Sequence, residues 1–280
     1  MAAYNAAATI REAVASILWQ SLSDWELIIA EDGSTDGTLG VIAGLSDNRI
    51  RVLSDGTNRG KPVRMNQIID QAQAPYLAIM DADDFSYPTR LERQVSHLEA
   101  NPHVDLLASG MATFDEGGHA GRWRRLRTEH ADIVRHPWLG FHFNSPTWVG
   151  KTAWFQHHRY SEGLRVAEDE DLLLRASATS VLEALPELLM AYRIDQWTWS
   201  KARSMRRDHA KALARAAMRQ RDLRPLAGVA VHGAKLLREG LAVATGREEV
   251  LLRKRALSLS GRETERLRTL YARLQREASQ

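Results

Sequence analysis

The first part of the chain alternates short apolar runs with stretches in which apolar residues recur at helical spacing. From Ala7 to Leu18 the apolar positions fall mostly three or four residues apart, as on one face of an α-helix. Short apolar runs bounded by polar loops predict buried strands. The pattern predicts helices at 7–20, 38–45, 63–72 and 90–100, and strands at 25–30, 50–53, 77–81 and 104–109. This alternation predicts an α/β fold with a mostly parallel, twisted sheet and helices on both faces.

The end of the chain follows a different pattern. Residues 197–280 are rich in Arg and Ala and read as mainly helical, with breaks expected at Pro225, Gly240 and Gly261. We therefore predict an α/β domain at 1–196 and a basic, mainly helical extension at 197–280. Between them, residues 117–150 form a less regular section rich in Trp, His, Arg and Pro, which is typical of loops that carry binding residues.

Composition narrows the class of protein. The 280 residues are 44% hydrophobic and 26% charged, and none is a cysteine, which excludes disulfides and thiolate metal sites. The opening residues lack the basic region and apolar core of a signal peptide. We also find no apolar stretch of the ~18 residues that a membrane span needs. The sequence indicates a soluble, cytoplasmic protein.

The net charge of +3 conceals an asymmetry. Residues 197–280 carry 20 Lys and Arg against 8 Asp and Glu, whereas residues 1–196 carry 18 against 27. Trp197 and Trp199, followed by the basic stretch 201–211, fit an interfacial location on an anionic membrane surface, the inner face of the cytoplasmic membrane. A set of well-solvated helices is the plainer alternative. No motif supports binding of nucleic acid.

Three carboxylates follow one predicted strand. Asp81, Asp83 and Asp84 end the apolar run that begins at Leu77, where open α/β sheets bind their ligands. Oxygen ligands of this kind suit Mg²⁺ or Mn²⁺. A solvated acidic turn is the alternative, and the segment alone does not decide between the two.

Several motifs then occur in a fixed order. They are Ala-Tyr-Asn at 3–5, Glu-Asp-Gly-Ser-Thr-Asp-Gly-Thr at 31–38, Asn-Arg-Gly at 58–60, Asp-Ala-Asp-Asp at 81–84 and Glu-Asp-Glu-Asp at 168–171. Together they resemble the family 2 glycosyltransferases over about residues 3–196. The resemblance implies the GT-A fold and transfer of a sugar, with inversion, from a nucleotide-diphosphate sugar to a glycan or lipid-linked acceptor. Synthesis of cell-envelope or extracellular polysaccharide is the expected setting.

The resemblance also implies roles on the donor side. Asp83 would bind Mn²⁺ or Mg²⁺ directly, and Asp81 would contact the metal through water or the ribose. Asp32 matches the aspartate that hydrogen-bonds the nucleobase, although helix capping is its alternative role. The remaining nucleotide-sugar contacts expected from the resemblance are Tyr4, Asn58, Lys61 and Arg64. Relatives often carry an arginine where this chain has Met65, so Lys61 or Arg64 would supply the cation.

The acceptor side follows from the last motif. Asp169 is the expected catalytic base, and Glu168 would orient it or touch the acceptor. An inverting transfer needs one such carboxylate to take the acceptor proton. The alternative is that these acids only stabilise a helix N-terminus. Trp148 is expected to contact the acceptor, with core packing as its alternative role. Asp171 is likewise expected to contact the acceptor, with helix capping as its alternative role.

Three further expectations complete this reading. The family has an apolar first strand before Ala-Tyr-Asn, so we expect that the native strand extends upstream of Met1. A haloacid-dehalogenase-like phosphotransferase also places Asp-x-Asp after a strand, but the later motif that it needs is missing. A catalytically inactive binding or scaffold protein of the same fold is the remaining alternative.

Overall fold

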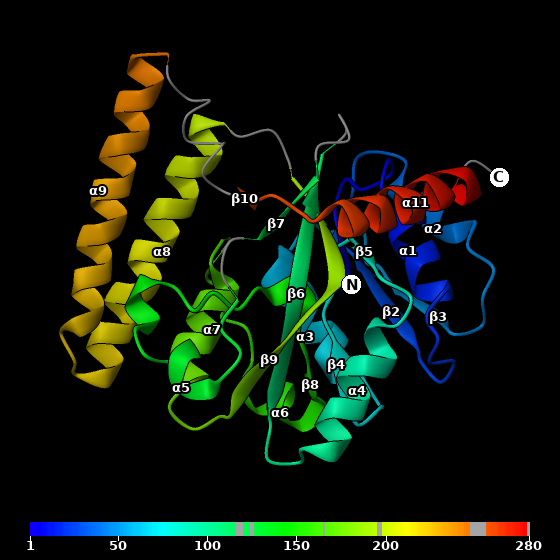
Figure 1. The fold of residues 1–280 in the computed structure, drawn as a ribbon, viewed down its shortest axis with the longest axis horizontal. Helices are drawn as coiled ribbons and strands as arrows, with labels where there is room; N and C mark the ends of the chain where they lie inside the picture. The colour runs from blue at the N-terminus through cyan, green and yellow to red at the C-terminus, as the bar shows by residue number, and fades with distance from the viewer. Residues whose placement is uncertain (116–119, 124–125, 165, 195–197, 247–255, 279–280) are drawn as a thin grey trace.

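The computed structural model confirms the α/β class, and it describes residues 1–115, 120–123, 126–164, 166–194, 198–246 and 256–278. Its N-terminal part is a parallel three-stranded sheet in the order β1-β2-β3, with helices between the strands (Figure 1). The elements of this part are β1 (Ala2–Ala3), α1 (Ile10–Leu18), β2 (Leu27–Glu31), α2 (Thr38–Ala43), β3 (Ile50–Leu53) and α3 (Lys61–Gln71). Apart from β1, for which no bounds within the chain were predicted, each lies within three residues of the predicted bounds.

A second sheet continues the fold and is mixed rather than mostly parallel. The long strands β6 and β9 run parallel, whereas β7, β8, β4, β5 and β10 pair antiparallel with their neighbours. A parallel bridge between Ala2 and Asp81 joins the two sheets. The elements are β4 (Tyr76–Ala78), β5 (Phe85–Ser86), α4 (Arg90–Ala100), β6 (Leu106–Phe114), β7 (Ala120–Trp123), α5 (His130–Ile133), the 3-10 turns η1 (Pro137–Leu139) and η2 (Ser145–Thr147), β8 (Val149–Lys151), α6 (Thr152–His157), α7 (Glu168–Ala176), β9 (Leu182–Arg193) and β10 (Ala256–Leu257).

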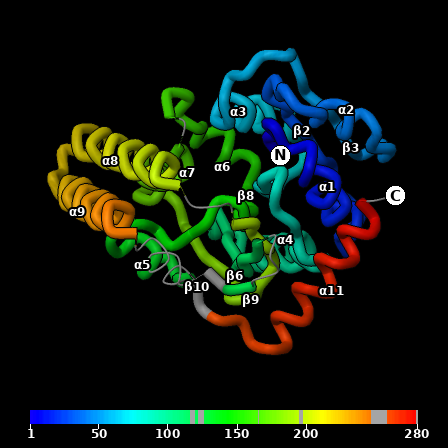
Figure 2. The backbone as a smooth tube through the Cα atoms, turned by 90° about the horizontal axis from the view of Figure 1, so that it is seen from above, coloured from blue at the N-terminus to red at the C-terminus, as the bar shows by residue number. Residues whose placement is uncertain are grey.

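The helical C-terminal part lies against two ends of the molecule. Helices α8 (Trp199–Gln220) and α9 (Arg224–Ala244) pack beside α7, and α11 (Gly261–Ala278) returns across the molecule to α1 (Figure 2). The leucines of α11 at 267, 270 and 274 share a core with Phe85 and Phe114. The breaks expected near Pro225 and Gly261 coincide with helix starts. The division of the chain at residue 196 remains a prediction.

The break expected at Gly240 is wrong, because α9 continues through it. A Cβ atom at Gly240 would lie 3.2 Å from the ring of Trp199, so the glycine lets the two helices approach. The same contact packs Trp199 of α8 against α9, and its expected place at a membrane surface remains a prediction. Trp197, the other expected membrane contact, lies outside the described residues.

The first strand is short, and a cavity lies beside it. The Met1 side chain is buried, and its ammonium donates a hydrogen bond of 2.8 Å to the carbonyl of Ile28. Burial lowers the pKa of this ammonium to about 5. A cavity of about 490 Å³, lined by Met1, Ile28, Ile68 and Leu77 among other residues, separates β2 from β4. The upstream strand remains a prediction.

Candidate active site

The acidic loop after β4 brings three carboxylates together. Oxygen atoms of Asp81, Asp83 and Asp84 all lie within 4.8 Å of one another. Asp84 is buried, and burial raises its pKa well above the ordinary value. One of its oxygens accepts a 2.9 Å hydrogen bond from the backbone of Arg193, and the other has no partner among the described residues.

This cluster fits a divalent metal. Its ligand atoms are all carboxylate oxygens, which Mg²⁺ and Mn²⁺ prefer. Asp81 and Asp83 are partly exposed, so they are the two that could bind an ion arriving with a ligand. Asp84 is held against Arg193 and supports the loop from inside.

Lys61 connects the acidic loop with α7. Its ammonium donates a 2.6 Å hydrogen bond to Asp81 and lies 3.8 Å from the carboxylate of Glu168. Burial alone would lower the pKa of Lys61, but these two carboxylates, with a further contribution from Asp169, raise it well above the ordinary value. Lys61 begins α3, where Gly60 at φ 89° and Pro62 set the turn into the helix.

The expected base and its neighbour begin α7. Ala167 precedes them in a left-handed conformation with φ 65°, and four acids fill the first helical turn. Glu168 is 8% exposed, and burial raises its pKa to about 7 although Lys61 opposes the rise. Asp169 is more exposed, and one of its oxygens accepts a 2.8 Å hydrogen bond from the backbone of Glu170. The carboxylate of Asp169 is therefore the more accessible of the two.

Buried Tyr160 lies near these charged groups. Burial is the largest cause that raises its pKa far above the ordinary value. Charges on Lys61, Glu168, Asp169 and Asp81 also act on this phenol. The contacts of Lys61 with Asp81 and with Glu168 show that the two acidic segments, well separated in sequence, come together.

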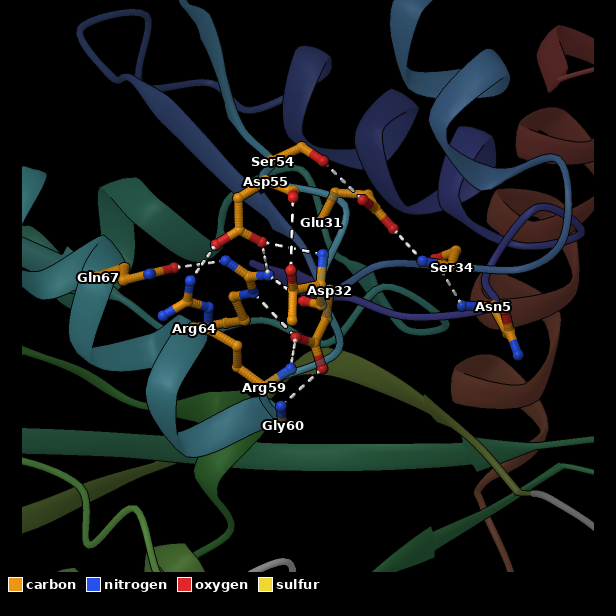
Figure 3. A network of polar contacts seen from close by, with 11 residues as sticks. Asn5, Glu31, Asp32, Ser34, Ser54, Asp55, Arg59, Gly60, Arg64 and Gln67 are labelled. Carbon is orange, nitrogen blue, oxygen red and sulfur yellow. Dashed lines mark hydrogen bonds and ion pairs between the residues drawn. The ribbon is translucent and has the colours of Figure 1, made fainter.

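A second polar network is built around Asp32 and Arg64 (Figure 3). Arg64 lies on α3, the helix that Lys61 begins. Asp32 accepts hydrogen bonds of 2.7 Å and 2.9 Å from the backbone N–H groups of Arg59 and Gly60. The buried guanidinium of Arg64 donates to Asp32 at 2.9 Å and to Asp55 at 2.6 Å, and it also bonds the carbonyl of Thr57. The network therefore fixes the loop that leads into α3.

Close packing of two loops accompanies this network. Gly33 has φ +66°, and a Cβ atom there would lie 2.7 Å from the backbone nitrogen of Asn58. Only glycine allows this approach without a shift of the loop. Asn58 and Tyr4 are both exposed, and Tyr4 is 49% exposed. In sequence, both lie close to the residues of this network. Arg64 does not face solvent as a free cation, because its donors are used inside the protein.

Two residues expected at the acceptor are buried instead. Trp148 is fully buried in the hydrophobic core, and its indole N–H lies 3.3 Å from the carbonyl of Phe143. Asp171 is also fully buried, and its carboxylate accepts from Ser161, Arg175 and Arg219 at 2.6–2.9 Å. Both serve the protein's own packing in this structure, so neither offers an acceptor an open surface.

Sequence analysis missed the part that Arg193 plays in this site. Its guanidinium donates to the backbone carbonyl of Asp83 at 3.0 Å, to Glu12 at 2.6 Å and to the hydroxyl of Tyr271 at 3.2 Å. The residue ties the acidic loop to α1 and α11. The available signal was the position of Arg193 at the end of the long apolar strand β9, because this strand end lies beside the acidic loop at 81–84.

Comparison with known proteins now identifies the family. The sequence profile described as Glycosyl transferase family 2 matches residues 1–160. The chain belongs to this family. It is 40% identical over 124 residues to "Putative glycosyltransferase EpsE" of Bacillus subtilis (strain 168), covering 43% of this chain and 45% of that one. It is 33% identical over 101 residues to "UDP-Glc:alpha-D-GlcNAc-diphosphoundecaprenol beta-1,3-glucosyltransferase WfgD" of Escherichia coli, covering 36% and 40%.

A solved structure supports the fold of this glycosyltransferase. Mannosyltransferase PcManGT from Pyrobaculum calidifontis, in complex with GDP-Man and Mn²⁺, matches 99% of this chain and 84% of its own, with a TM-score of 0.60. Identity is 16%, so the match establishes the GT-A fold and not the substrate. The chain spans less than half the length of the two sequence relatives named above.

Proposed function

We propose that this family 2 protein transfers a sugar from a nucleotide-diphosphate sugar to a hydroxyl group of a glycan or lipid-linked acceptor, with inversion. The observation that carries the proposal is the meeting of two acidic segments at Lys61, which contacts Asp81 at 2.6 Å and lies 3.8 Å from Glu168. Sugar transfer needs one group to hold the departing diphosphate and another to activate the acceptor. The two segments supply carboxylates for both tasks.

On the donor side, Asp81 and Asp83 would hold Mn²⁺ or Mg²⁺. When bound, such an ion neutralises the negative charge that develops on the departing diphosphate. Lys61 adds a positive charge at the same place, next to Asp81. The presence of Mn²⁺ and GDP-Man in the PcManGT complex is consistent with this assignment.

The nucleotide would lie along the loop that carries Asn58, with Tyr4 near its edge. Asp32 would contribute through the backbone of Arg59 and Gly60, which its carboxylate holds. Arg64 would contribute by holding Asp32 and Asp55 rather than by contacting phosphate. Contact of Asp32 with the nucleobase requires that one of these hydrogen bonds be shared or exchanged.

On the acceptor side, Asp169 would take the hydroxyl proton as that oxygen attacks the anomeric carbon. The bond from this carbon to the diphosphate oxygen breaks on the opposite face, and the nucleoside diphosphate leaves with the electron pair. A single base suffices for this displacement. Glu168 is less accessible and lies near Lys61, so its role would be to orient the site.

The names of the relatives support a role in assembling a cell-envelope or extracellular polysaccharide. WfgD is named for an acceptor linked to diphosphoundecaprenol, which is a lipid. We infer the same class of acceptor here, with the protein acting on the cytoplasmic side of the membrane.

A panel of nucleotide sugars tests the proposal. Unfolding temperature is measured with each donor in the presence and absence of Mn²⁺, and release of nucleoside diphosphate is followed with candidate acceptors. A donor at one hundred times its Kd should stabilise the protein by about 2.7 kcal/mol. Asp83→Ala should abolish the Mn²⁺-dependent part of the shift. If no donor stabilises the wild-type protein with Mn²⁺, the proposal is wrong.

A further inference from the structure

The outer face of α9 is apolar along its whole length. Leu223, just before the helix, and Leu237 are each 77% exposed, Leu241 is 66% exposed and Leu226 is 43% exposed. The exposed positions between them are mainly small, at Ala227, Ala230, Gly233 and Ala234. These residues recur every three or four positions and therefore form one stripe. We call them the α9 stripe.

The α9 stripe faces away from the rest of the protein. Figure 1 shows α9 as the outermost helix, with α8 between it and α7, and Figure 2 shows α8 and α9 side by side at the same edge of the molecule. Opposite to the stripe, α9 packs on α8 through Gly228, where a Cβ atom would lie 2.8 Å from Leu213, and through Gly240 against Trp199. The helix therefore buries Gly228, His232 and Glu239 and leaves the large apolar side chains of the stripe outside.

Charge around the stripe is strongly positive. Residues 198–246 carry eleven Lys and Arg against three Asp and Glu. Each of the three acids is paired within this part of the chain: Asp208 with Lys211 at 3.1 Å, Asp222 with Arg224 at 2.7 Å and Glu239 with Arg206 at 2.7 Å. On α9 itself, Arg224, Lys235 and Arg238 follow one flank of the stripe at helical spacing.

We infer that the α9 stripe docks on the surface of an anionic lipid bilayer. An apolar helical face with basic residues along its side is typical of helices that lie in the membrane interface. Among the described helices, none is long and apolar enough to cross a bilayer. Docking of this kind leaves the helix parallel to the surface.

A second copy of the chain suits this face less well. Pairing two α9 stripes would bring two strongly basic helix pairs into contact, and like charges oppose such an association. Anionic lipid headgroups instead attract the same Arg and Lys side chains, with a contribution of about 1 kcal/mol per residue near the surface. Charge complementarity therefore selects the bilayer. The inference does not require the proposed sugar transfer.

Vesicle co-sedimentation of the full chain tests this inference. Vesicles of phosphatidylcholine alone are compared with vesicles of phosphatidylcholine and phosphatidylglycerol in equal amounts. Wild-type protein should bind the anionic vesicles, and added salt should weaken the binding. The double variant Leu237→Gln with Leu241→Gln should bind at least about tenfold more weakly, since it removes two exposed apolar side chains. The matched control is Leu39→Gln on α2, which is 48% exposed in wild type and should change nothing.

Several outcomes would overturn the inference. Equal sedimentation with neutral and anionic vesicles would contradict the selection of an anionic bilayer by charge, and no sedimentation with either would exclude docking on a bilayer. Unchanged binding by the double variant would exclude the stripe. A wild-type dimer that becomes monomeric in the double variant, with no vesicle binding, would assign the stripe to a second copy. Circular dichroism and unfolding temperature show whether each variant is folded. Co-sedimentation uses no nucleotide sugar, so its result does not depend on whether the protein binds a donor.

Discussion

The two polar networks beside the site differ in how their charges are satisfied. Around Asp32 and Arg64, backbone N–H groups, a guanidinium and carboxylates form a closed set of hydrogen bonds. Around Asp81 and Glu168, by contrast, carboxylates from both acidic segments share the ammonium of Lys61. Burial raises the pKa of Glu168 to about 7, so the positive charge of Lys61 does not fully offset the cost of burying this carboxylate.

This difference separates a scaffold from a reacting centre. A closed network holds its loop in one geometry before any ligand arrives, which lowers the cost of ordering the loop on binding. An acidic cluster that shares Lys61 and keeps partly exposed carboxylates is instead suited to receive a metal and a diphosphate, or to take a proton. Substitutions in the first network should therefore affect mainly stability, and substitutions in the second mainly activity.

The largest expected effect is on turnover. Asp169→Asn removes the proposed base while keeping the shape of the side chain, so we expect kcat to fall about 10³-fold. Donor affinity and unfolding temperature should stay close to wild type. Steady-state kinetics and a donor thermal shift measure the two quantities. Asp132→Asn on α5, an exposed acid far along the chain from both acidic segments, is the matched control. Full activity in Asp169→Asn would exclude it as the base.

The next effect is on stability. Arg64→Ala leaves the buried carboxylate of Asp32 without its guanidinium partner, so we expect a loss of about 3 kcal/mol in the free energy of unfolding. Urea denaturation followed by circular dichroism measures it. Arg59→Ala is the control, because Arg59 pairs with Asp55 at the surface and its loss should matter little. Equal stability of both variants would contradict the scaffold role of the network.

The smallest expected effect is on the pH dependence of the free energy of unfolding, and it arises where α8 meets α7. His209 lies 2.6 Å from Glu170, next to the proposed base, and donates through its other nitrogen to Met205. Burial alone would lower the pKa of His209, but the hydrogen bond and charge of Glu170 raise it. His232 stacks on the ring of His209 with centroids 5.0 Å apart, and burial lowers the pKa of His232 to about 3. The charge of Asp169 also acts on His209, and the charges of Arg206 and Lys235 act on His232.

A group whose pKa is raised on folding stabilises the protein below its ordinary pKa, about 6.5 for His, and loses this effect as pH rises through the folded value. Near pH 6 the free energy of unfolding of wild type should therefore exceed that of His209→Gln by about 1.5 kcal/mol, which is the contribution of a hydrogen bond to a charged group. The difference should shrink toward pH 9. Urea denaturation at several pH values measures it. A difference that stays constant with pH would show that the ion pair contributes nothing.

Much of the fold followed from patterns that are local in sequence. Periodicity located α1, α4 and β3 closely, and the order of the motifs indicated both acidic segments. Burial was harder to predict, because it depends on which elements cover a residue. Trp148 is covered by core residues distant in sequence, and Arg64 is enclosed by a loop that crosses over it. Gly240 was misread because Trp199, which packs on it, belongs to another helix.

The last helix of the chain completes structure that the first residues begin. The leucines of α11 cover Phe85 and Phe114, and Tyr271 holds Arg193, which in turn holds the acidic loop and α1. Synthesis on the ribosome proceeds from the N-terminus, so those early segments emerge before their cover exists. The nascent polypeptide therefore keeps these aromatic rings without that cover until α11 has been synthesised. A product terminated before Gly261 would lack it permanently and would expose a surface that chaperones recognise.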